Sequence, residues 1–229
     1  MFGFDNAGPK RKPSELAGAH DETASQLGED REGLASGLAS GTKVATTYGW
    51  CAVERISVGD KVLTFDAGMQ EVVAITRGHL WRRPDCPPNL WPLYVPEGAL
   101  GNAQPLLLLP EQSVMIESDV GEEIYGDPFT LIPAASLDGF RGIQRSAPAQ
   151  DLQAITLHFE QDQVVFTASG GLLFCPSSQR GSVTDLLEGA PGDYTILDRA
   201  DADFLIGCIA VDERHHEAEQ LPLAGRAMV

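Results

Sequence analysis

Side chains that could act as nucleophiles are few and widely spaced in this sequence. The four cysteines form no C-x-x-C pair, which argues against a zinc ribbon and against a redox motif; they are Cys51, Cys86, Cys175 and Cys208. Cys51 follows Trp50 at the start of an expected strand, and no His or Lys lies near enough in the sequence to activate its thiol. We therefore interpret the cysteines as buried free thiols.

The histidines do not have the spacing of a metal site. His79 and Cys86 in GHLWRRPDC could supply two ligands, and the adjacent His215 and His216 could add more. That pair lies in the charged stretch DERHHEAE, which is typical of a solvated surface, and no four-ligand set at a recognised spacing emerges. His158 lies inside an apolar run and is interpreted as a packing residue. The sequence predicts neither a metal ion nor a cofactor.

Composition narrows the classes of partner. The formal net charge is −17, from 33 acidic and 16 basic residues, and this argues against a nucleic-acid or anionic-membrane binder because phosphate contacts need clustered Lys and Arg. Signatures for nucleotide binding, serine hydrolases and zinc proteases are absent from the chain. A protein or peptide partner of unknown identity is the expectation. The tryptophans Trp50, Trp81 and Trp91 either line a groove for such a ligand or pack within hairpins.

The elements that must position any site are expected to be short strands. The 24 glycines and 15 prolines punctuate the chain every few residues and favour strands and turns over long helices. KVATTYGWCAVERI (43–56) predicts two strands broken at Tyr48-Gly49, and the runs 61–65 and 69–81 flank a turn at 66–68. LLLLPEQSVMI (106–116) predicts a buried strand, a turn and a second strand, and residues 152–170 predict a hairpin around Glu160 to Asp162.

A few segments depart from this pattern. In SDVGEEIYG (118–126), Asp119 followed by Glu122 predicts a helix N-cap, and Gly126 predicts the helix end. Five prolines in RRPDCPPNLWPLYVPEG (82–98) predict an extended loop. Beyond Cys175 we expect one helix at 183–187, one strand at 193–197 and an unanchored end at 221–229.

Several motifs in order resemble a bacterial subgroup of Hint domains, the hedgehog/intein autoprocessing fold. They are GTKVAT, the hairpin that carries SVGDKVLTFD, VPEGALGN, LLLLPEQSVMIES and DQVVF, and the likeness spans residues 37 to 175. The resemblance implies a mostly β, compact antiparallel fold with a few short helices. In active members, a first cysteine attacks the preceding carbonyl while a Thr-x-x-His element orients the scissile amide and protonates its nitrogen.

This chain departs from the family at the residues that carry the reaction. The cysteine position, four residues before Gly41 of the Gly-Thr pair, is Gly37. The Thr-x-x-His element aligns with residues 109–112, which places Leu109 at the Thr position and Gln112 at the His position. Glutamine can hydrogen-bond an amide but cannot shuttle a proton near neutral pH. The chain also lacks the terminal Asn that splicing needs, because its asparagines are Asn6, Asn89 and Asn102.

Two hypotheses follow from the resemblance. In the first, the chain is a Hint-type domain without autoprocessing activity, used as a binding or regulatory module. In the second, it is an autocatalytic domain that cuts near residues 36–41 with Ser36 or Ser40 as the nucleophile.

Domain boundaries are expected near residues 36 and 176. Residues 1–36 have the composition of a disordered tail, residues 37–176 form the Hint-like β domain, and residues 177–229 are an extension that packs on it or trails from it. The chain shows no cleavable secretory signal and no segment long enough to span a bilayer. Cytoplasmic residence is the default expectation, and export by a route without a cleavable signal stays open.

Overall fold

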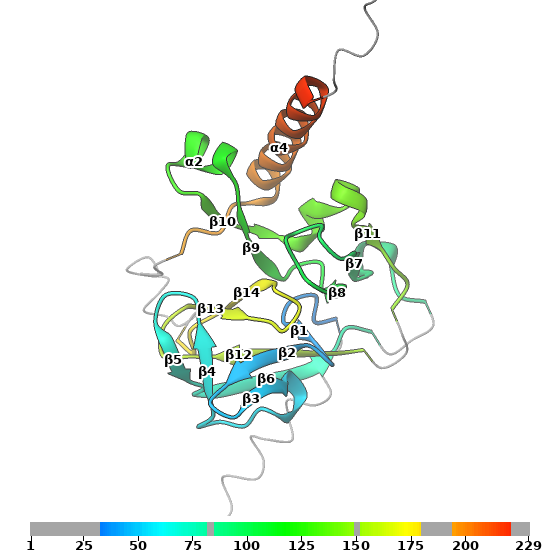
Figure 1. The fold of residues 1–229 in the computed structure, drawn as a ribbon. Coiled ribbons are helices and arrows are strands. Elements are labelled where there is room, and N and C mark those ends of the chain that lie inside the picture. The colour runs from blue at the N-terminus through cyan, green and yellow to red at the C-terminus, as the bar shows by residue number, and fades with distance from the viewer. Residues whose placement is uncertain (1–32, 82–84, 149–151, 180–193, 221–229) are drawn as a thin grey trace, which may run out of the picture.

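Two antiparallel β-sheets and two α-helices make up most of the described chain (Figure 1). The computed structural model describes residues 33–81, 85–148, 152–179 and 194–220. The first sheet has the strand order β11 (Gln144–Arg145), β7 (Leu93–Val95), β8 (Leu106–Leu108), β1 (Leu38–Ala39), β12 (Gln153–His158) and β6 (Ala74–His79). The predicted fold class, mostly β and antiparallel with few helices, is confirmed.

The second sheet contains the remaining strands. Its order is β10 (Phe129–Pro133), β9 (Ser113–Glu117), β14 (Leu172–Cys175), β13 (Gln163–Phe166), β4 (Lys61–Thr64), β2 (Lys43–Thr46) and β3 (Gly49–Ala52), with β5 (Gly68–Glu71) paired to β4. Short 3-10 turns connect the strands at Val53–Arg55 (η1), Pro88–Leu90 (η2), Ala134–Leu137 (η3) and Phe140–Gly142 (η4). The helices are α2 (Asp119–Tyr125) and α4 (Arg199–Gln220).

The local hairpins predicted from turn residues are present, but one predicted pairing is wrong. The β2–β3 and β4–β5 hairpins close at Thr46 opposite Gly49 and at Thr64 opposite Gly68. The predicted hairpin at 152–170 does not exist, because β12 pairs with β6 and β1 while β13 pairs with β14 and β4. Both strands are buried and need neighbours on each side, so the residues around Glu160 carry the chain from one sheet to the other.

The proline-rich loop is also more ordered than expected. Residues 93–95 form β7, which pairs with β8 and β11, so the prediction of a wholly extended loop over 82–98 is wrong. None of the five prolines falls within β7, which leaves its backbone amides free to pair. Pro88 instead begins the short turn η2.

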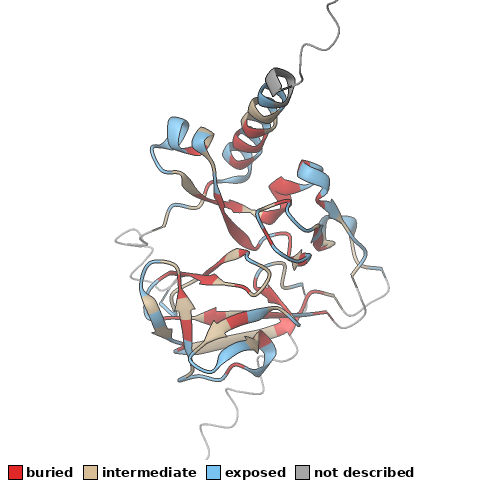
Figure 2. Cartoon of the chain, viewed as in Figure 1, coloured by how far each residue is buried: buried red, intermediate tan, exposed pale blue. Residues whose placement is uncertain are grey.

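The core joins the two sheets, and buried residues concentrate in the strands (Figure 2). Leu38 of β1 belongs to this main cluster, together with residues such as Val44, Ile132 and Ile155. The next residue, Ala39, points to a second buried cluster with Leu80, Leu109, Leu152 and Ala154. Since successive strand residues face opposite sides, β1 is fixed between two buried clusters.

The N-cap of helix α2 lies one residue earlier than the sequence predicts. The N-cap is Ser118, whose Oγ accepts a hydrogen bond from the Gly121 amide, so the assignment of Asp119 as the cap is wrong by one position. Serine in an extended conformation satisfies an otherwise unpaired amide of the first turn. Gly126 ends the helix in the left-handed conformation with φ 79°, as the sequence predicts.

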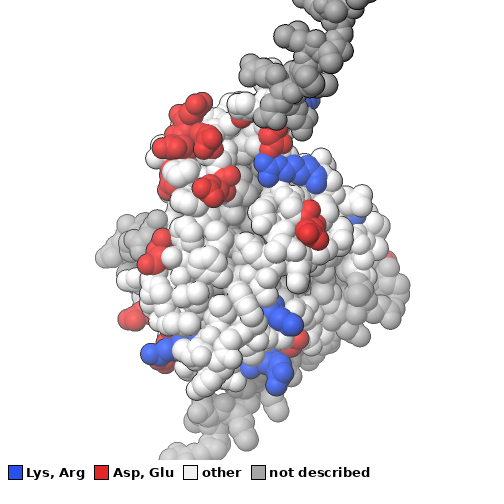
Figure 3. Space-filling model, viewed as in Figure 1, with Lys and Arg blue, Asp and Glu red and all other residues white. Residues whose placement is uncertain are grey.

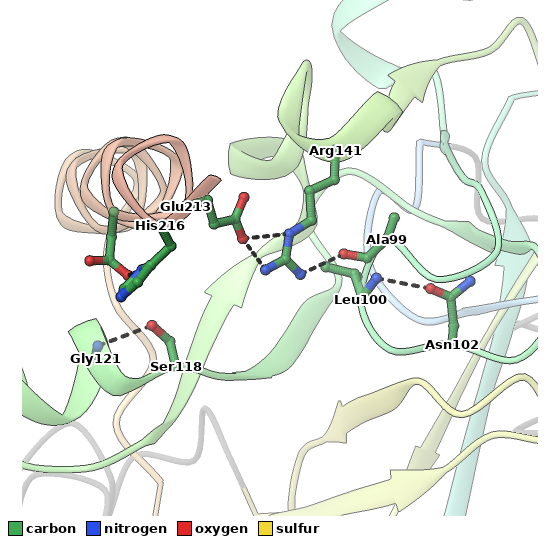
Figure 4. Close-up of polar contacts among 9 residues, drawn as sticks. Ala99, Leu100, Asn102, Ser118, Gly121, Arg141, Glu213 and His216 are labelled. Atoms are coloured by element: carbon green, nitrogen blue, oxygen red, sulfur yellow. Dashed lines mark hydrogen bonds and ion pairs between the residues drawn. The ribbon is translucent and has the colours of Figure 1, made fainter. Parts of the chain in front are cut away.

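Helix α4 is the main element that the sequence did not predict. It contains the DERHHEAE stretch, in which the exposed His215 and His216 confirm the interpretation as a solvated surface, and it buries Ala202, Leu205, Ile206 and Ile209. Arg141 holds the helix to the β body, because its guanidinium pairs with Glu213 and donates to the Ala99 carbonyl at 2.9 Å (Figure 4). The expected strand at 193–197 is reduced to one parallel bridge between Ile196 and Leu131.

Some expectations fall outside the described residues. These are the tail before residue 33, the helix at 183–187 and the end at 221–229. Within the described part of the chain, no helix has both the length and the apolar character needed to cross a bilayer.

Candidate functional site

The residue that precedes β1 contacts the turn between β8 and β9. The backbone N–H of Gly37 donates a hydrogen bond to Oε1 of Gln112 at 2.9 Å, across a sequence separation of 75 residues. This N–H belongs to the Ser36–Gly37 peptide bond. The fold therefore brings together the two positions that the resemblance had aligned with the nucleophile and the histidine, and we call this contact the junction.

Neighbouring backbone groups fix the orientation of the Gln112 side chain. Its Nε2 donates to the carbonyl oxygens of Ser113 and Phe174, each at 2.8 Å, and the residue is only 2% exposed. Because both carbonyls require a donor, the amide nitrogen must face them and the amide oxygen must face Gly37. At the junction, Gln112 is consequently an acceptor with no proton to donate.

Gly37 lies in a conformation and a space that exclude a side chain. Its φ is +113°, a region that L-residues rarely adopt. A Cβ atom here would lie 2.8 Å from Thr156 Oγ1 and 3.2 Å from both the carbonyl carbon and oxygen of Ile155. Backbone atoms of β12 cannot rotate away as a side chain can, so any larger residue requires the strand or the junction to shift.

The turn at residues 109–112 is held rigidly from several sides. Leu109 is fully buried in the second cluster, and its carbonyl accepts a hydrogen bond from the Gln112 amide at 3.0 Å. The Ala134 amide donates to the Gln112 carbonyl, and the Glu111 amide donates to the Ala35 carbonyl. The last contact ties the turn directly to the segment that enters the junction.

Comparison with known families decides which kind of domain this is. The sequence model of the family described as Hint domain matches residues 36–171, which is more than half of the chain. The chain belongs to the Hint domain family. The match begins beside Gly37 and includes both partners of the junction.

Three of the solved structures to which this chain is similar are inteins or intein-like domains. One is a bacterial intein-like domain from Clostridium thermocellum, with 14% identity over 61% of this chain and 98% of that chain and a TM-score of 0.43. Another is the MchDnaB-1 intein, with 14% identity over 59% of this chain and 98% of that chain and a TM-score of 0.34. A third is a splice-inactive variant of the AceL NrdHF class 3 split intein, with 18% identity over 62% and 98% and a TM-score of 0.31. No curated protein shows significant similarity to the chain.

The alternative nucleophiles of this Hint domain lie on either side of the junction. Ser36 is exposed and Ser40 is half-buried. Neither hydroxyl forms a hydrogen bond with any residue that the structure describes. The Ser40 amide donates to the Gln153 carbonyl at 3.0 Å, and its side chain borders an open cavity of about 580 Å³ that Trp50 also lines. Trp50 is exposed at this cavity, and its role in binding a ligand stays a prediction.

The cysteines of the Hint domain are poorly suited to attack. Burial raises the pKa of the Cys175 thiol to about 12, so this residue next to Phe174 stays protonated. Burial also raises the pKa of Cys86, with a smaller contribution from the Asp85 carboxylate. Cys51 is half-buried and packs against the main core. All four cysteines are free thiols, but only Cys175 is buried, so the interpretation of the cysteines as buried thiols is confirmed for Cys175 and wrong for the partly buried Cys51, Cys86 and Cys208.

The histidines that the structure describes lie on three different elements, β6, β12 and α4. Nε2 of His158 lies 2.9 Å from Thr76 Oγ1 in a cross-strand contact, and burial lowers its pKa despite a backbone hydrogen bond with Ser177. His215 and His216 are exposed on α4, where His216 lies 3.2 Å from Asp212. Across the described residues, no three His, Cys, Asp or Glu side chains come together as a metal site would require.

Sequence reasoning identified Gly37, Leu109 and Gln112 but missed the groups that surround them. The Phe174 carbonyl and Thr156 belong to β14 and β12, which are far from the junction in sequence. No local pattern announces these contacts, because they depend on which strands become neighbours.

Proposed function

We propose that this Hint domain has lost autoprocessing and serves as a binding or regulatory module. The observation that carries the proposal is the hydrogen bond from the Gly37 N–H to Gln112 Oε1. Cleavage by the family's route requires a nucleophile at position 37 and a proton donor for that nitrogen. A glycine offers no nucleophile, and a carboxamide oxygen offers no proton.

The surroundings of the junction support the same proposal. The space that a cysteine Cβ would need lies within contact distance of Ile155 backbone atoms. A working site also needs room for a tetrahedral intermediate beside the nucleophile, and here Gln112 is buried with each of its polar atoms bonded. The contact therefore has the features of a structural connection.

The competing function is self-cleavage near residues 36–41 through Ser36 or Ser40. Ser40 borders the cavity lined by Trp50, which gives its hydroxyl access to solvent. A serine hydroxyl needs a base that accepts its proton, and the Ser40 hydroxyl forms no hydrogen bond with a described residue. For this reason we prefer the proposal that the domain has lost autoprocessing.

Intact-mass spectrometry of the purified full chain distinguishes the two functions. We expect the full mass to persist for days, both for the protein alone and for the protein incubated with hydroxylamine or a thiol. These reagents would cleave the chain at an ester or thioester intermediate if one formed. A fragment that lacks the first 35 residues (attack by Ser36) or the first 39 residues (attack by Ser40) would support self-cleavage instead.

A double variant, Ser36→Ala with Ser40→Ala, is the matched control for that experiment. If the wild type yields a fragment that the double variant does not, the chain is autocatalytic and the proposal is wrong. If both proteins yield the same fragment, a contaminating protease made it. Protease inhibitors present from the start of the purification should then prevent the cleavage and preserve the full mass.

A further inference from the structure

Helix α4 carries a second apolar stripe on the face that does not pack against the β body. Phe204, Cys208 and Val211 follow one another at helical spacing, and Phe204 and Val211 are 59% and 43% exposed. This stripe lies opposite Ile124 of α2, which is 42% exposed. Together with Val120 on α2, these side chains line an open cavity of about 580 Å³, which we call the α2–α4 groove.

The rim of the groove is acidic. Glu123 of α2 and Asp203 and Asp212 of α4 line it, and no described Lys or Arg does. Asp203 pairs with Arg199 one turn away and Asp212 with His216, but both pairs are exposed and therefore weak. Figure 3 shows acidic side chains gathered over α2 at the top of the molecule.

The α4 side of the groove is backed by the main core. The opposite face of α4 buries Leu205, Ile206 and Ile209 in the main core. Arg141 fastens the helix near Glu213, and Ser118 caps α2 on the other side (Figure 4). A partner would meet two helices already in place, which lowers the entropic cost of binding.

We propose that the α2–α4 groove binds a basic amphipathic helix of a partner protein. Apolar side chains of such a helix would cover Phe204, Val211 and Ile124, while its Lys and Arg residues would face the acidic rim. This inference rests on the proposed binding role and assigns it to a surface. A second copy of this chain fits poorly, because pairing the same face would bring carboxylates against carboxylates.

The test measures binding of a synthetic peptide by the full chain. The probe is a fluorescent 18-residue helix of Leu and Lys only, with Leu at positions i, i+3, i+4 and i+7, followed by fluorescence anisotropy. We expect saturable binding that Phe204→Glu and Ile124→Glu each weaken by about tenfold or more. Tyr48→Glu is the matched control, since Tyr48 is 95% exposed on the β2–β3 turn; it should change the affinity less than about twofold.

Several results would overturn the proposal. One is unchanged affinity in both groove variants while their unfolding midpoints match that of the wild type. Another is equal binding of a control peptide in which every Leu is Ser, because charge alone would then explain the contact. If the protein forms a dimer that Phe204→Glu dissociates, the occupant of the groove is a second copy of the chain. If the probe binds only after residues 221–229 are removed, the occupant is the C-terminal segment of the same chain.

These outcomes can be separated from failure of the proposed loss of autoprocessing. Cleavage near residues 36–41 is read by intact mass and leaves α2 and α4 in the larger fragment. If the chain is cleaved and still binds the probe, only the proposed loss of autoprocessing is contradicted. An uncleaved chain that does not bind the probe contradicts only the groove assignment.

Discussion

At the junction, each polar atom of the Gln112 side chain has a partner and the surrounding space is filled, whereas the α2–α4 groove leaves large apolar side chains in contact with water. The first arrangement lowers the free energy of the folded state through satisfied buried hydrogen bonds. The second lowers it little, because exposed apolar area gains nothing from folding until a partner covers it.

This difference indicates two separate roles: the junction stabilises the fold, and the α2–α4 groove is available for binding. Substitutions at the junction should act on the free energy of unfolding, since its groups are buried and bonded. Substitutions in the groove should act on binding and leave stability nearly unchanged. Four substitutions test this separation.

The largest effect is expected for Gly37→Ala. The new Cβ would combine an unfavourable positive φ with contacts of 2.8 Å to Thr156 Oγ1 and 3.2 Å to the Ile155 backbone, so we expect a loss of about 3 to 4 kcal/mol in the free energy of unfolding. Urea denaturation followed by tryptophan fluorescence measures it. The control is Gly41→Ala, which has φ +88° but no atom within 4 Å of the added Cβ and should lose only about 1 kcal/mol. Equal losses in both variants would show that the junction is not close-packed.

Gln112→Leu should have the next largest effect. It removes three hydrogen bonds and leaves the Gly37 N–H and the Ser113 and Phe174 carbonyls buried without their partner. We expect a loss of about 3 kcal/mol. The matched control is Gln153→Leu, whose side chain is exposed on β12, with an expected change within about 0.5 kcal/mol. Similar stability of the two variants would contradict the structural role of Gln112.

The junction also indicates how far the sequence could predict this molecule. Order and spacing of motifs placed Gly37 and Gln112 at related positions, and the fold brings them within 2.9 Å. Local turn chemistry at Tyr48-Gly49 and at residues 66–68 predicted two hairpins correctly. The pairing of β12 with β6 and β1 escaped prediction, because adjacency along the chain does not determine which buried strands become neighbours.

Helix α4 shows a different limit. It has apolar residues on two faces, since Leu205 and Ile206 are buried while Phe204 and Val211 are exposed. Its charged second half resembles a solvated segment, and no single apolar stripe stands out from the pattern. A helix that serves both the core and a partner is therefore hard to recognise from periodicity alone. The interpretation of Gly37 and Gln112 as lost catalytic positions stays a prediction until self-cleavage is measured.

A smaller effect is expected at the edge of the groove for Ser118→Ala. The substitution removes the Ser118 Oγ atom that accepts a hydrogen bond from the Gly121 amide, and it should lower the free energy of unfolding by about 1 kcal/mol. Since the cap fixes the first turn of α2, the same variant should also weaken binding of the peptide probe. Asp119→Ala, the position favoured by the sequence pattern, serves as the control and should change stability by about 0.5 kcal/mol or less. A larger loss of stability for Asp119→Ala than for Ser118→Ala would show that Asp119 is the N-cap.

The smallest effect on stability is expected for Phe204→Ala. The side chain is 59% exposed, so its truncation removes little buried area and should change the free energy of unfolding by no more than about 0.5 kcal/mol. Leu205→Ala is the matched control one residue along α4, because Leu205 is fully buried and its truncation should cost about 2 to 5 kcal/mol. A large loss for Phe204→Ala would mean that its ring packs in the free protein and is not available to a partner. The groove would then have the same structural role as the junction, and the division between the two regions would be lost.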